Sequence, residues 1–416
     1  MTYPDMVRLF GRIGCLSFGG PAAQIALMQN ELVDDRPVMT QSEFLKALSF
    51  CMLLPGPEAM QLATYAGWTL RGVRGGLIAG LLFVLPGAVV IALLAGLYVQ
   101  FGDVPLVQAA FLGIKATVII IVVQAILRLL GKALARMDHR IVAAVAFLAL
   151  FAFALPFPLV IFAAGLYGYL SCADPSPGRV ALPWRRSLAP VGIGAVLWAA
   201  PLVVAWATGA AFLLAVGLFF STLAVVTFGG AYAVLAYMTQ AVVTDFGWID
   251  TTQMIDALGL AETTPGPLIL VTQFVGTLAG HGQGGWGMAA LAGLMTLWVT
   301  FVPCFIWIFA GAPLMAWLDT APRLRAALAA ITAAVVGVIA NLSVWFALHV
   351  LFDTLTPAPA PFAMLIPDWS TFNAAAAVLT ALAGYLLLVR KVPLLPTLGL
   401  MALAGLALSA VMGAGT

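Results

Sequence analysis

Long apolar runs separated by short polar segments fill this chain almost from end to end. A bilayer core takes about 20 apolar residues per helix. The runs predict thirteen membrane-spanning segments, at 4–33, 42–70, 72–99, 105–132, 139–155, 157–172, 187–208, 211–243, 253–279, 285–312, 324–351, 371–389 and 394–413. The fifth and sixth are short for full spans, and only 173–186 and 353–370 are polar or proline-rich enough to form substantial loops. The pattern predicts an all-α polytopic membrane protein.

Composition supports this prediction. The chain is 63% hydrophobic and 8% charged, whereas a soluble domain carries roughly 25% charged residues. So few charges cannot cover a water-facing surface, so most of the surface must face lipid. The net charge of +2 gives no indication of a nucleic-acid partner. The four cysteines form no CxxC motif, which favours buried thiols over a metal site or a disulfide framework.

Basic residues lie in alternate loops and predict the orientation. They are Arg71, Arg74, Lys132, Arg136, Arg140, Arg179, Arg185, Arg186, Arg323, Arg325, Arg390 and Lys391. With thirteen spans, all these loops fall on one side, which the positive-inside rule assigns to the cytoplasm. We therefore expect a multi-pass membrane protein with its N-terminus in the cytoplasm and its C-terminus outside.

The chain contains an internal repeat. The motif SFGG at 17–20 returns as TFGG at 227–230, and the Pro-Gly-Pro at 55–57 returns at 265–267, each 210 residues later. Farther along, the offset becomes 217, since Pro86 aligns with Pro303 and Gln124 with Asn341.

The repeat predicts three parts of the chain. These are a six-span repeat at 1–172, a basic loop plus linking span at 173–210, and a second six-span repeat at 211–416. The odd linking span inverts the second copy, an arrangement typical of secondary transporters. The alternative is a duplication without functional meaning.

The repeated motifs interrupt apolar helices. Proline removes a backbone donor and glycine tolerates turns, and irregular backbone at membrane depth is tolerated only inside protein or beside a wet cavity. Helix N-termini freed by such breaks attract anions. The candidate substrate-binding residues at the breaks are Ser17, Phe18, Gly19, Gly20, Pro55, Gly56, Pro57, Thr227, Phe228, Gly229, Gly230, Thr264, Pro265, Gly266 and Pro267. The alternative is that the glycines only permit close helix packing and the prolines only produce kinks.

Ionisable and amide side chains inside the spans are further candidates. Arg12 and Lys115 could offset the charge of a bound dianion, unless they snorkel to the interface. Further candidate substrate-binding side chains are Gln24, Gln61, Gln273 and Asn341, which could equally be interhelical hydrogen-bonding groups.

Two glutamates beside the breaks are candidates for proton coupling. Glu58 directly follows one Pro-Gly-Pro and Glu262 precedes the other, yet they align with Leu268 and Met52, so the acids are not duplicated. A carboxylate beside an anion either takes up a proton or repels the substrate, unless a basic residue compensates. The alternative is a buried ion pair that serves structure alone.

Enzymatic signals are weak. The chain has no HExxH and no Walker A motif. Pairing of Ser17 with His349 for intramembrane proteolysis has no support in the sequence. We expect no enzyme activity, no metal and no cofactor.

The motifs resemble the chromate ion transporter family in its long two-repeat form. The matching stretches include FGRIGCLSFGGPAAQIALM (10–28), MLLPGPEAMQLATYAGW (52–68), TFGGAYAVLAYM (227–238) and LAETTPGPLILVTQFVG (260–276), and the resemblance covers nearly the whole chain. It implies an inner-membrane secondary transporter that exports chromate and gives resistance to it, with sulfate as a related substrate. Family members often have His where this chain has Gln24. If that His handles protons in the family, the task here falls to Glu58 or Glu262, or the coupling differs.

The leading hypothesis is therefore a proton-motive-force-driven exporter of chromate or a similar tetrahedral oxyanion such as sulfate. The expected partners are the oxyanion, protons and the lipid bilayer, with a homodimer left open. The alternatives are a passive anion channel, a transporter of another small anion, and a non-transport scaffold.

Overall fold

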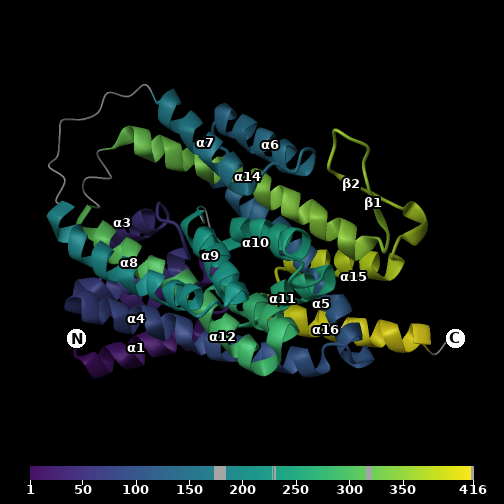
Figure 1. Ribbon diagram of the computed structural model, residues 1–416, viewed down its shortest axis with the longest axis horizontal. Coiled ribbons are helices and arrows are strands. Elements are labelled where there is room, and N and C mark those ends of the chain that lie inside the picture. Colours follow the sequence, from purple (N-terminus) through teal and green to yellow (C-terminus); the bar gives the residue numbers. More distant parts are fainter. Residues whose placement is uncertain (173–183, 227, 229–230, 315–320, 414–416) are drawn as a thin grey trace. The chain divides into compact units, whose positions relative to one another are not determined.

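The computed structural model describes residues 1–416 apart from 173–183, 227, 229–230, 315–320 and 414–416. The candidates Thr227, Gly229 and Gly230 thus lie outside the described residues. Through the first half of the chain, the elements in Figure 1 are α1 (Tyr3–Leu16), α2 (Gly20–Gln29), η1 (Asn30–Asp34), α3 (Gln41–Cys51), α4 (Glu58–Phe101), α5 (Pro105–Ala133), α6 (Met137–Phe151), α7 (Phe157–Ser171) and α8 (Trp184–Ala207).

The second half repeats this order in part. Its helices are α9 (Ala211–Val226), α10 (Ala231–Gln240), η2 (Ala241–Asp245), α11 (Thr251–Thr263), η3 (Leu268–Leu270), α12 (Val271–Gly311), η4 (Ala312–Leu314), α14 (Pro322–Leu351), η5 (Trp369–Thr371), α15 (Ala374–Gly384), η6 (Tyr385–Val389) and α16 (Leu394–Gly413). The π-helices η1 and η2 follow the SFGG and TFGG motifs at corresponding places.

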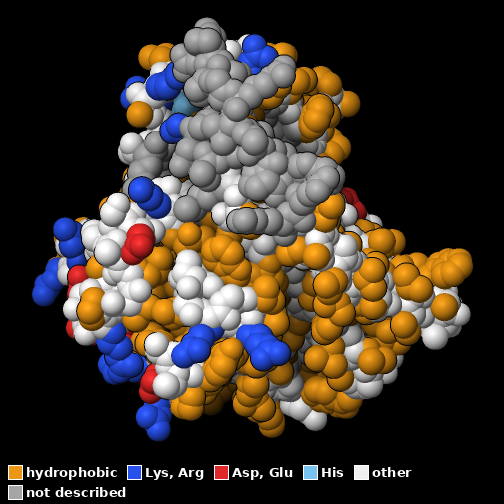
Figure 2. All heavy atoms as spheres, turned by 90° about the vertical axis from the view of Figure 1, so that its left-hand side faces the viewer, with side chains coloured by type: hydrophobic (Ala, Val, Ile, Leu, Met, Phe, Trp, Pro, Cys, Tyr) orange, Lys and Arg blue, Asp and Glu red, His pale blue; other side chains and the backbone are white. Residues whose placement is uncertain are grey.

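Among the residues that the structure describes, six helical segments are long and apolar enough to cross a membrane. They are Glu58–Phe101, Pro105–Gly131, Ser187–Ala207, Leu268–Leu314, Pro322–Leu351 and Leu394–Val411, and shorter apolar helices accompany them. Large apolar side chains such as Leu93, Val196 and Leu403 are exposed. Figure 2 shows one face on which hydrophobic side chains cover broad areas between scattered charged ones. The chain is a helical polytopic membrane protein, as the apolar runs predicted.

The segment 353–370 departs from the all-α prediction. It forms a two-stranded antiparallel hairpin of β1 (Leu355–Pro357) and β2 (Leu365–Pro367), with Thr356 opposite Ile366. Its prolines oppose helix formation, while its Thr, Leu and Ile residues suit an extended backbone. The segment is thus an ordered hairpin between helices.

The predicted helix breaks are confirmed wherever the structure describes them. Gly19 and Gly20 lie between α1 and α2, and their φ angles of 85° and 78° are in the left-handed region. Gly56 and Gly266 take φ angles of 113° and 84° in the two Pro-Gly-Pro turns. Only glycine adopts such angles readily, so the motifs impose the interruptions locally.

A second kind of turn divides α4 and α12. Each carries one left-handed glycine, Gly72 (φ 61°) and Gly285 (φ 67°), where the helical path is interrupted. A Cβ on Gly67 would collide with the carbonyl oxygen of Gly75, so the chain folds back on itself at Gly72. Each long helix is therefore a helical hairpin, with arms at 58–70 and 73–101 in α4 and at 271–283 and 286–311 in α12.

The chain forms two compact units, each discontinuous in sequence. Unit 1 contains Met1–Ala95, Gly168–Val234 and Thr264–Leu328, and unit 2 contains Gly96–Tyr167, Leu235–Thr263 and Ala329–Thr416. Within unit 1, α12 packs against α8 and α9. Within unit 2, α5 packs against α11, α15 and α16. Each unit takes segments from both halves of the sequence, so the compact units differ from the sequence repeats.

Close packing of α5 against α16 requires a glycine, which gives a stability prediction. A Cβ at Gly113 would collide with the backbone carbonyl of Met401, whereas Gly131 on the same helix faces open space. We expect Gly113→Ala to lower the free energy of unfolding by about 1–3 kcal/mol, the usual cost of overpacking. Gly131→Ala should be neutral or stabilising by up to about 1 kcal/mol, because alanine favours helix. Thermal unfolding of both purified variants in detergent measures the difference, and equal melting temperatures would contradict it.

Candidate functional site

The SFGG break of the first half binds directly to the Pro-Gly-Pro break of the second half, within unit 1. The backbone N–H of Gly266 donates to the carbonyl oxygen of Ser17 at 2.9 Å. The side-chain Nε2 of Gln24 donates to the carbonyl oxygens of Gly266 at 2.6 Å and of Ser17 at 3.3 Å. Ser17 and Gln24 are buried, so this junction lies inside the protein.

A glycine on α4 makes room for this junction. A Cβ on Gly87 would collide with the carbonyl oxygen of Pro265, and a Cβ on Gly266 would lie 3.3 Å from the carbonyl oxygen of Phe83. In the second half, the residue aligned with Gly87 at the 217 offset is Cys304, and a Cβ on Gly56 would lie 2.9 Å from its Sγ. Each Pro-Gly-Pro turn thus packs against the long arm of the other half's hairpin helix.

Helix N-termini at the junction carry no side-chain cap. Gly19 is the N-cap of α2 and Pro267 that of η3, and neither makes a side-chain capping bond. The Ser17 hydroxyl donates to Ile13 O at 2.6 Å within its own helix. Free backbone N–H groups at helix starts carry partial positive charge and suit a small anion. The junction can offer such donors without a charged side chain.

Gln61 and Gln273 also form hydrogen bonds within unit 1. Gln61 Nε2 donates to the carbonyl oxygen of Pro55 at 2.6 Å, and Gln273 Nε2 donates to that of Ala88 at 3.1 Å. Within the described part of the chain, the Oε1 atoms of both amides are buried without a hydrogen-bond partner. These oxygens remain open to a donor such as water or a protonated ligand.

Arg12 forms an ion pair with Glu31, a residue that the sequence analysis did not single out. Its Nε lies 3.1 Å from Oε1 of Glu31 on η1, and the Arg12 side chain is 58% exposed while that of Glu31 is 5% exposed. The aligned residues of the second half are Thr222 and Ala241. The pair is thus a feature of one half only.

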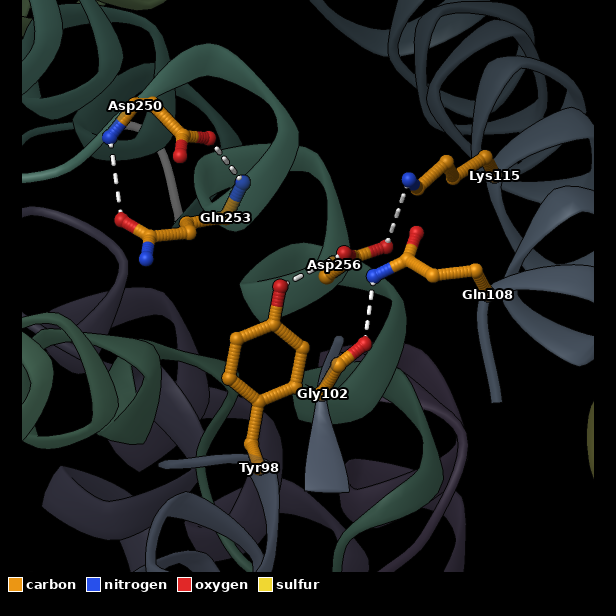
Figure 3. A network of polar contacts seen from close by, with 7 residues as sticks. All are labelled: Tyr98, Gly102, Gln108, Lys115, Asp250, Gln253 and Asp256. Carbon is orange, nitrogen blue, oxygen red and sulfur yellow. Dashed lines mark hydrogen bonds and ion pairs between the residues drawn. The ribbon is translucent and has the colours of Figure 1, made fainter. Parts of the chain in front are cut away.

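Lys115 lies in unit 2, where α5, α11 and the end of α4 bring three side chains together (Figure 3). Its Nζ is 3.2 Å from Oδ1 of Asp256, and the hydroxyl of Tyr98 donates to Oδ2 of Asp256 at 2.7 Å. Asp256 is fully buried. The sequence analysis missed Asp256 and Tyr98, although an Asp inside the predicted span 253–279 was a sufficient signal.

The remaining candidates are distributed over both units. Glu58 is half-buried in the first turn of α4, where a carboxylate favours the helix dipole. Glu262 and Thr264 are buried, and Phe228 is half-buried. Asn341 lines a cavity of about 220 Å³ in unit 2, together with side chains of α6, α10, α14 and the β-hairpin segment.

A pairing of Ser17 with His349, which the sequence does not support, has no support in the contacts either. Ser17 belongs to unit 1 and donates to its own helix, while His349 belongs to unit 2 and its Nδ1 lies 2.8 Å from the carbonyl oxygen of Trp345. Both groups are thus engaged by carbonyl oxygens one turn earlier. Among the described residues, no cluster of His, Cys, Asp and Glu could hold a metal ion.

Buried helix breaks in a helical polytopic protein define the class to which this chain belongs, that of membrane transporters with interrupted helices. The chain belongs to the chromate transporter family, whose model matches residues 4–169 and 214–408. The family consists of transporters, so the protein is a transporter and not an enzyme.

Relatives of full and of partial length match the chain. It is 34% identical over 345 residues to a chromate transport protein of Pseudomonas aeruginosa, covering 82% of this chain and 80% of the relative. It is 29% identical over 364 residues to the chromate transport protein of Cupriavidus metallidurans, covering 85% of each. An uncharacterized transporter of Bacillus subtilis, YwrA, is 27% identical over 158 residues, which are 37% of this chain and 89% of YwrA. No solved structure matches the chain.

Proposed function

We propose that the protein exports chromate, or a similar tetrahedral oxyanion such as sulfate, across the inner membrane by secondary active transport. The proton-motive force drives this transport, which gives resistance to chromate. The single observation that carries the proposal is the buried junction of Ser17, Gln24 and Gly266, where two broken helices start without side-chain caps. The names of the two long relatives support chromate as the substrate.

We propose thirteen spans in two inverted repeats, at 1–172 and 211–416, with a basic loop and a linking span at 173–210. The N-terminus is then cytoplasmic and the C-terminus periplasmic. Support comes from features found in both halves, namely the breaks, the π-helices and the left-handed hairpin glycines. The two separate regions matched by the family, and a relative of about one repeat in length, agree with a duplication.

In this proposal, the break residues and their amide neighbours contact the oxyanion through backbone and side-chain N–H groups. Arg12 in unit 1 and Lys115 in unit 2 are the candidate cations, each for an oxyanion bound in its own unit. Glu58 and Glu262 are the acids beside the breaks that would bind protons. The buried or half-buried positions of these acids support a role beyond surface charge.

Transport into inverted membrane vesicles tests the function. We expect saturable uptake of radiolabelled chromate that requires an energised membrane and that sulfate reduces by competition. Valinomycin and nigericin separate the electrical from the proton component of the driving force. Uptake that persists unchanged without any gradient would indicate the passive channel, and absence of saturable uptake would refute transport of chromate.

A further inference from the structure

Lys115 is unusual among the cations of this chain. Among the Lys and Arg side chains that the structure describes, it alone is not exposed, and its side chain is 15% accessible. Its ion-pair partner, Asp256, is 0% accessible. A charge inside a membrane protein is costly and marks a functional site by default. The Lys115–Asp256 pair therefore differs from the exposed basic residues of the loops, and we look for a functional role for it.

We propose that Asp256 is an internal carboxylate that occupies Lys115 until Asp256 takes up a proton, whereupon the Lys115 ammonium binds the oxyanion. The inference rests on the proposed function and identifies an acid other than Glu58 and Glu262 as the proton-binding group. The proton adds to the carboxylate of Asp256, and no covalent bond to the oxyanion forms. The oxyanion then takes the place of Asp256 beside Nζ of Lys115.

The geometry supports competition between the carboxylate and the substrate. Asp256 presents one oxygen to Lys115 and the other to Tyr98, so the ammonium and the carboxylate neutralise each other in this structure. A neutral Asp256 can still accept the Tyr98 hydrogen bond while it gives up the ion pair. An oxyanion is a second anionic ligand for the Lys115 ammonium. The oxyanion and the Asp256 carboxylate therefore compete for that ammonium.

Other charged groups near the pair are few. Asp250 acts on Asp256 through space, and Asp103 acts on Tyr98. Asp250 also caps α11, where it accepts from the backbone N–H of Gln253 at 2.8 Å. The helices α15 and α16, which pack on α5, contain no titratable side chain. Lys115 is the cation in direct contact with Asp256.

The pair joins two closely packed helices of unit 2. Helix α11 packs on α5 close to the pair, because a Cβ on Gly259 would collide with Ile114. Lys115 on α5 and Asp256 on α11 thus lie at a tight helix contact.

The pair is present in one half only. At the repeat offsets, Asp256 aligns with Lys46 and Lys115 with Thr332. A duplicated pair would be expected if it served only to fasten corresponding helices. The asymmetry instead suits a single proton-binding group in a duplicated framework.

Proton and oxyanion then move together. Because protonation of Asp256 favours the oxyanion at Lys115, the bound oxyanion favours the proton equally. One proton with one dianion carries a net charge of −1 outward. The negative interior of the cell drives that movement, so the electrical part of the proton-motive force powers export.

Equilibrium binding of radiolabelled chromate to the purified full-length protein in detergent tests the proposal across a pH series. At each pH, the dissociation constant of the variant is divided by that of the wild type. This ratio cancels the effect of the titration of chromate itself. We expect wild-type affinity to fall as the pH rises relative to Asp256→Asn, which should bind at least about tenfold more tightly at alkaline pH. Lys115→Gln and the double variant K115Q/D256N should bind at least about tenfold more weakly than Asp256→Asn at every pH.

The double variant separates a binding role from a structural one. Removing both partners of a buried pair leaves no unpaired charge and is often tolerated by the fold. Wild-type binding by the double variant would show that the pair is structural, and so would a wild-type pH profile for Asp256→Asn. If Lys115→Gln does not fold, the pH profile of Asp256→Asn alone decides.

Control variants separate this inference from the proposed function. Arg128→Gln removes an exposed charge from the same helix. It should bind chromate as the wild type does. If the wild type binds no chromate, the proposed function fails. If it binds and Glu262→Gln rather than Asp256→Asn abolishes the pH dependence, only the inference fails.

Discussion

Replacing Gly87 by alanine should reduce chromate transport by at least about tenfold. The added Cβ would collide with the carbonyl oxygen of Pro265, in the turn that binds Ser17 and Gln24. Neither segment can move easily, because the colliding atom of Pro265 belongs to the backbone and Gly87 lies in a packed helix. Overpacking of this kind costs about 1–3 kcal/mol. The expected loss is of transport more than of folding, because the collision acts on the junction itself.

Uptake into inverted vesicles, normalised to the amount of folded protein, measures this effect. Gly11→Ala is the matched control, since Gly11 lies on a helix of the same unit and faces open space. It should transport at the wild-type rate. Wild-type uptake by Gly87→Ala would show that the junction tolerates displacement and does not form the substrate site.

The two Pro-Gly-Pro turns differ in how well their contacts tolerate an added side chain. At the first-half turn, Gly56 faces a side chain, that of Cys304, which can adjust its position. At the second-half turn, Gly266 packs against Gly87, so both partners lack a side chain. The duplicated sequence therefore produces two contacts of unequal tightness, and the second-half turn is the more sensitive of the two.

The helix boundaries followed from local chemistry and could be predicted from sequence. Proline and paired glycines determine where α1, α3 and α11 end, because no other residue types combine a missing donor with left-handed φ angles. The long apolar runs gave the positions of α5, α8 and α14 closely. The β-hairpin at 355–367 was missed because three-residue strands leave too little alternation to recognise.

The partners of the site residues could not be predicted. The repeat shows that SFGG and Pro-Gly-Pro occur twice, but not that Ser17 meets Gly266 of the other half. That contact joins residues about 240 positions apart, and no local rule determines it. Asp256 could have been singled out as an acid inside a predicted span. Its pairing with Lys115 could not, because the two residues are far apart in sequence and only the fold shows that the charges meet.

Gln24→Glu should reduce transport about a hundredfold at neutral pH. Gln24 is held between two carbonyl oxygens, so it must present its NH₂ group to both of them. A glutamate carboxylate is nearly isosteric, but it can only accept hydrogen bonds and would repel both oxygens. The two hydrogen bonds from Gln24 are lost, and the buried carbonyl of Gly266 loses this donor, while that of Ser17 keeps the Gly266 N–H. Together with the repulsion, this costs roughly 3 kcal/mol.

The pH dependence of Gln24→Glu distinguishes this mechanism from a simple packing defect. A protonated glutamate again has an O–H donor, so uptake by the variant should recover in part as the pH falls, relative to wild type at the same pH. Gln29→Glu makes the same chemical change on the same helix, where the side chain is half-buried, and should show no such recovery. Gln24→Leu, which lacks any donor, should stay inactive at every pH. Equal recovery of the Leu and Glu variants would contradict the role of the donated hydrogen bonds, because only the Glu variant can regain one.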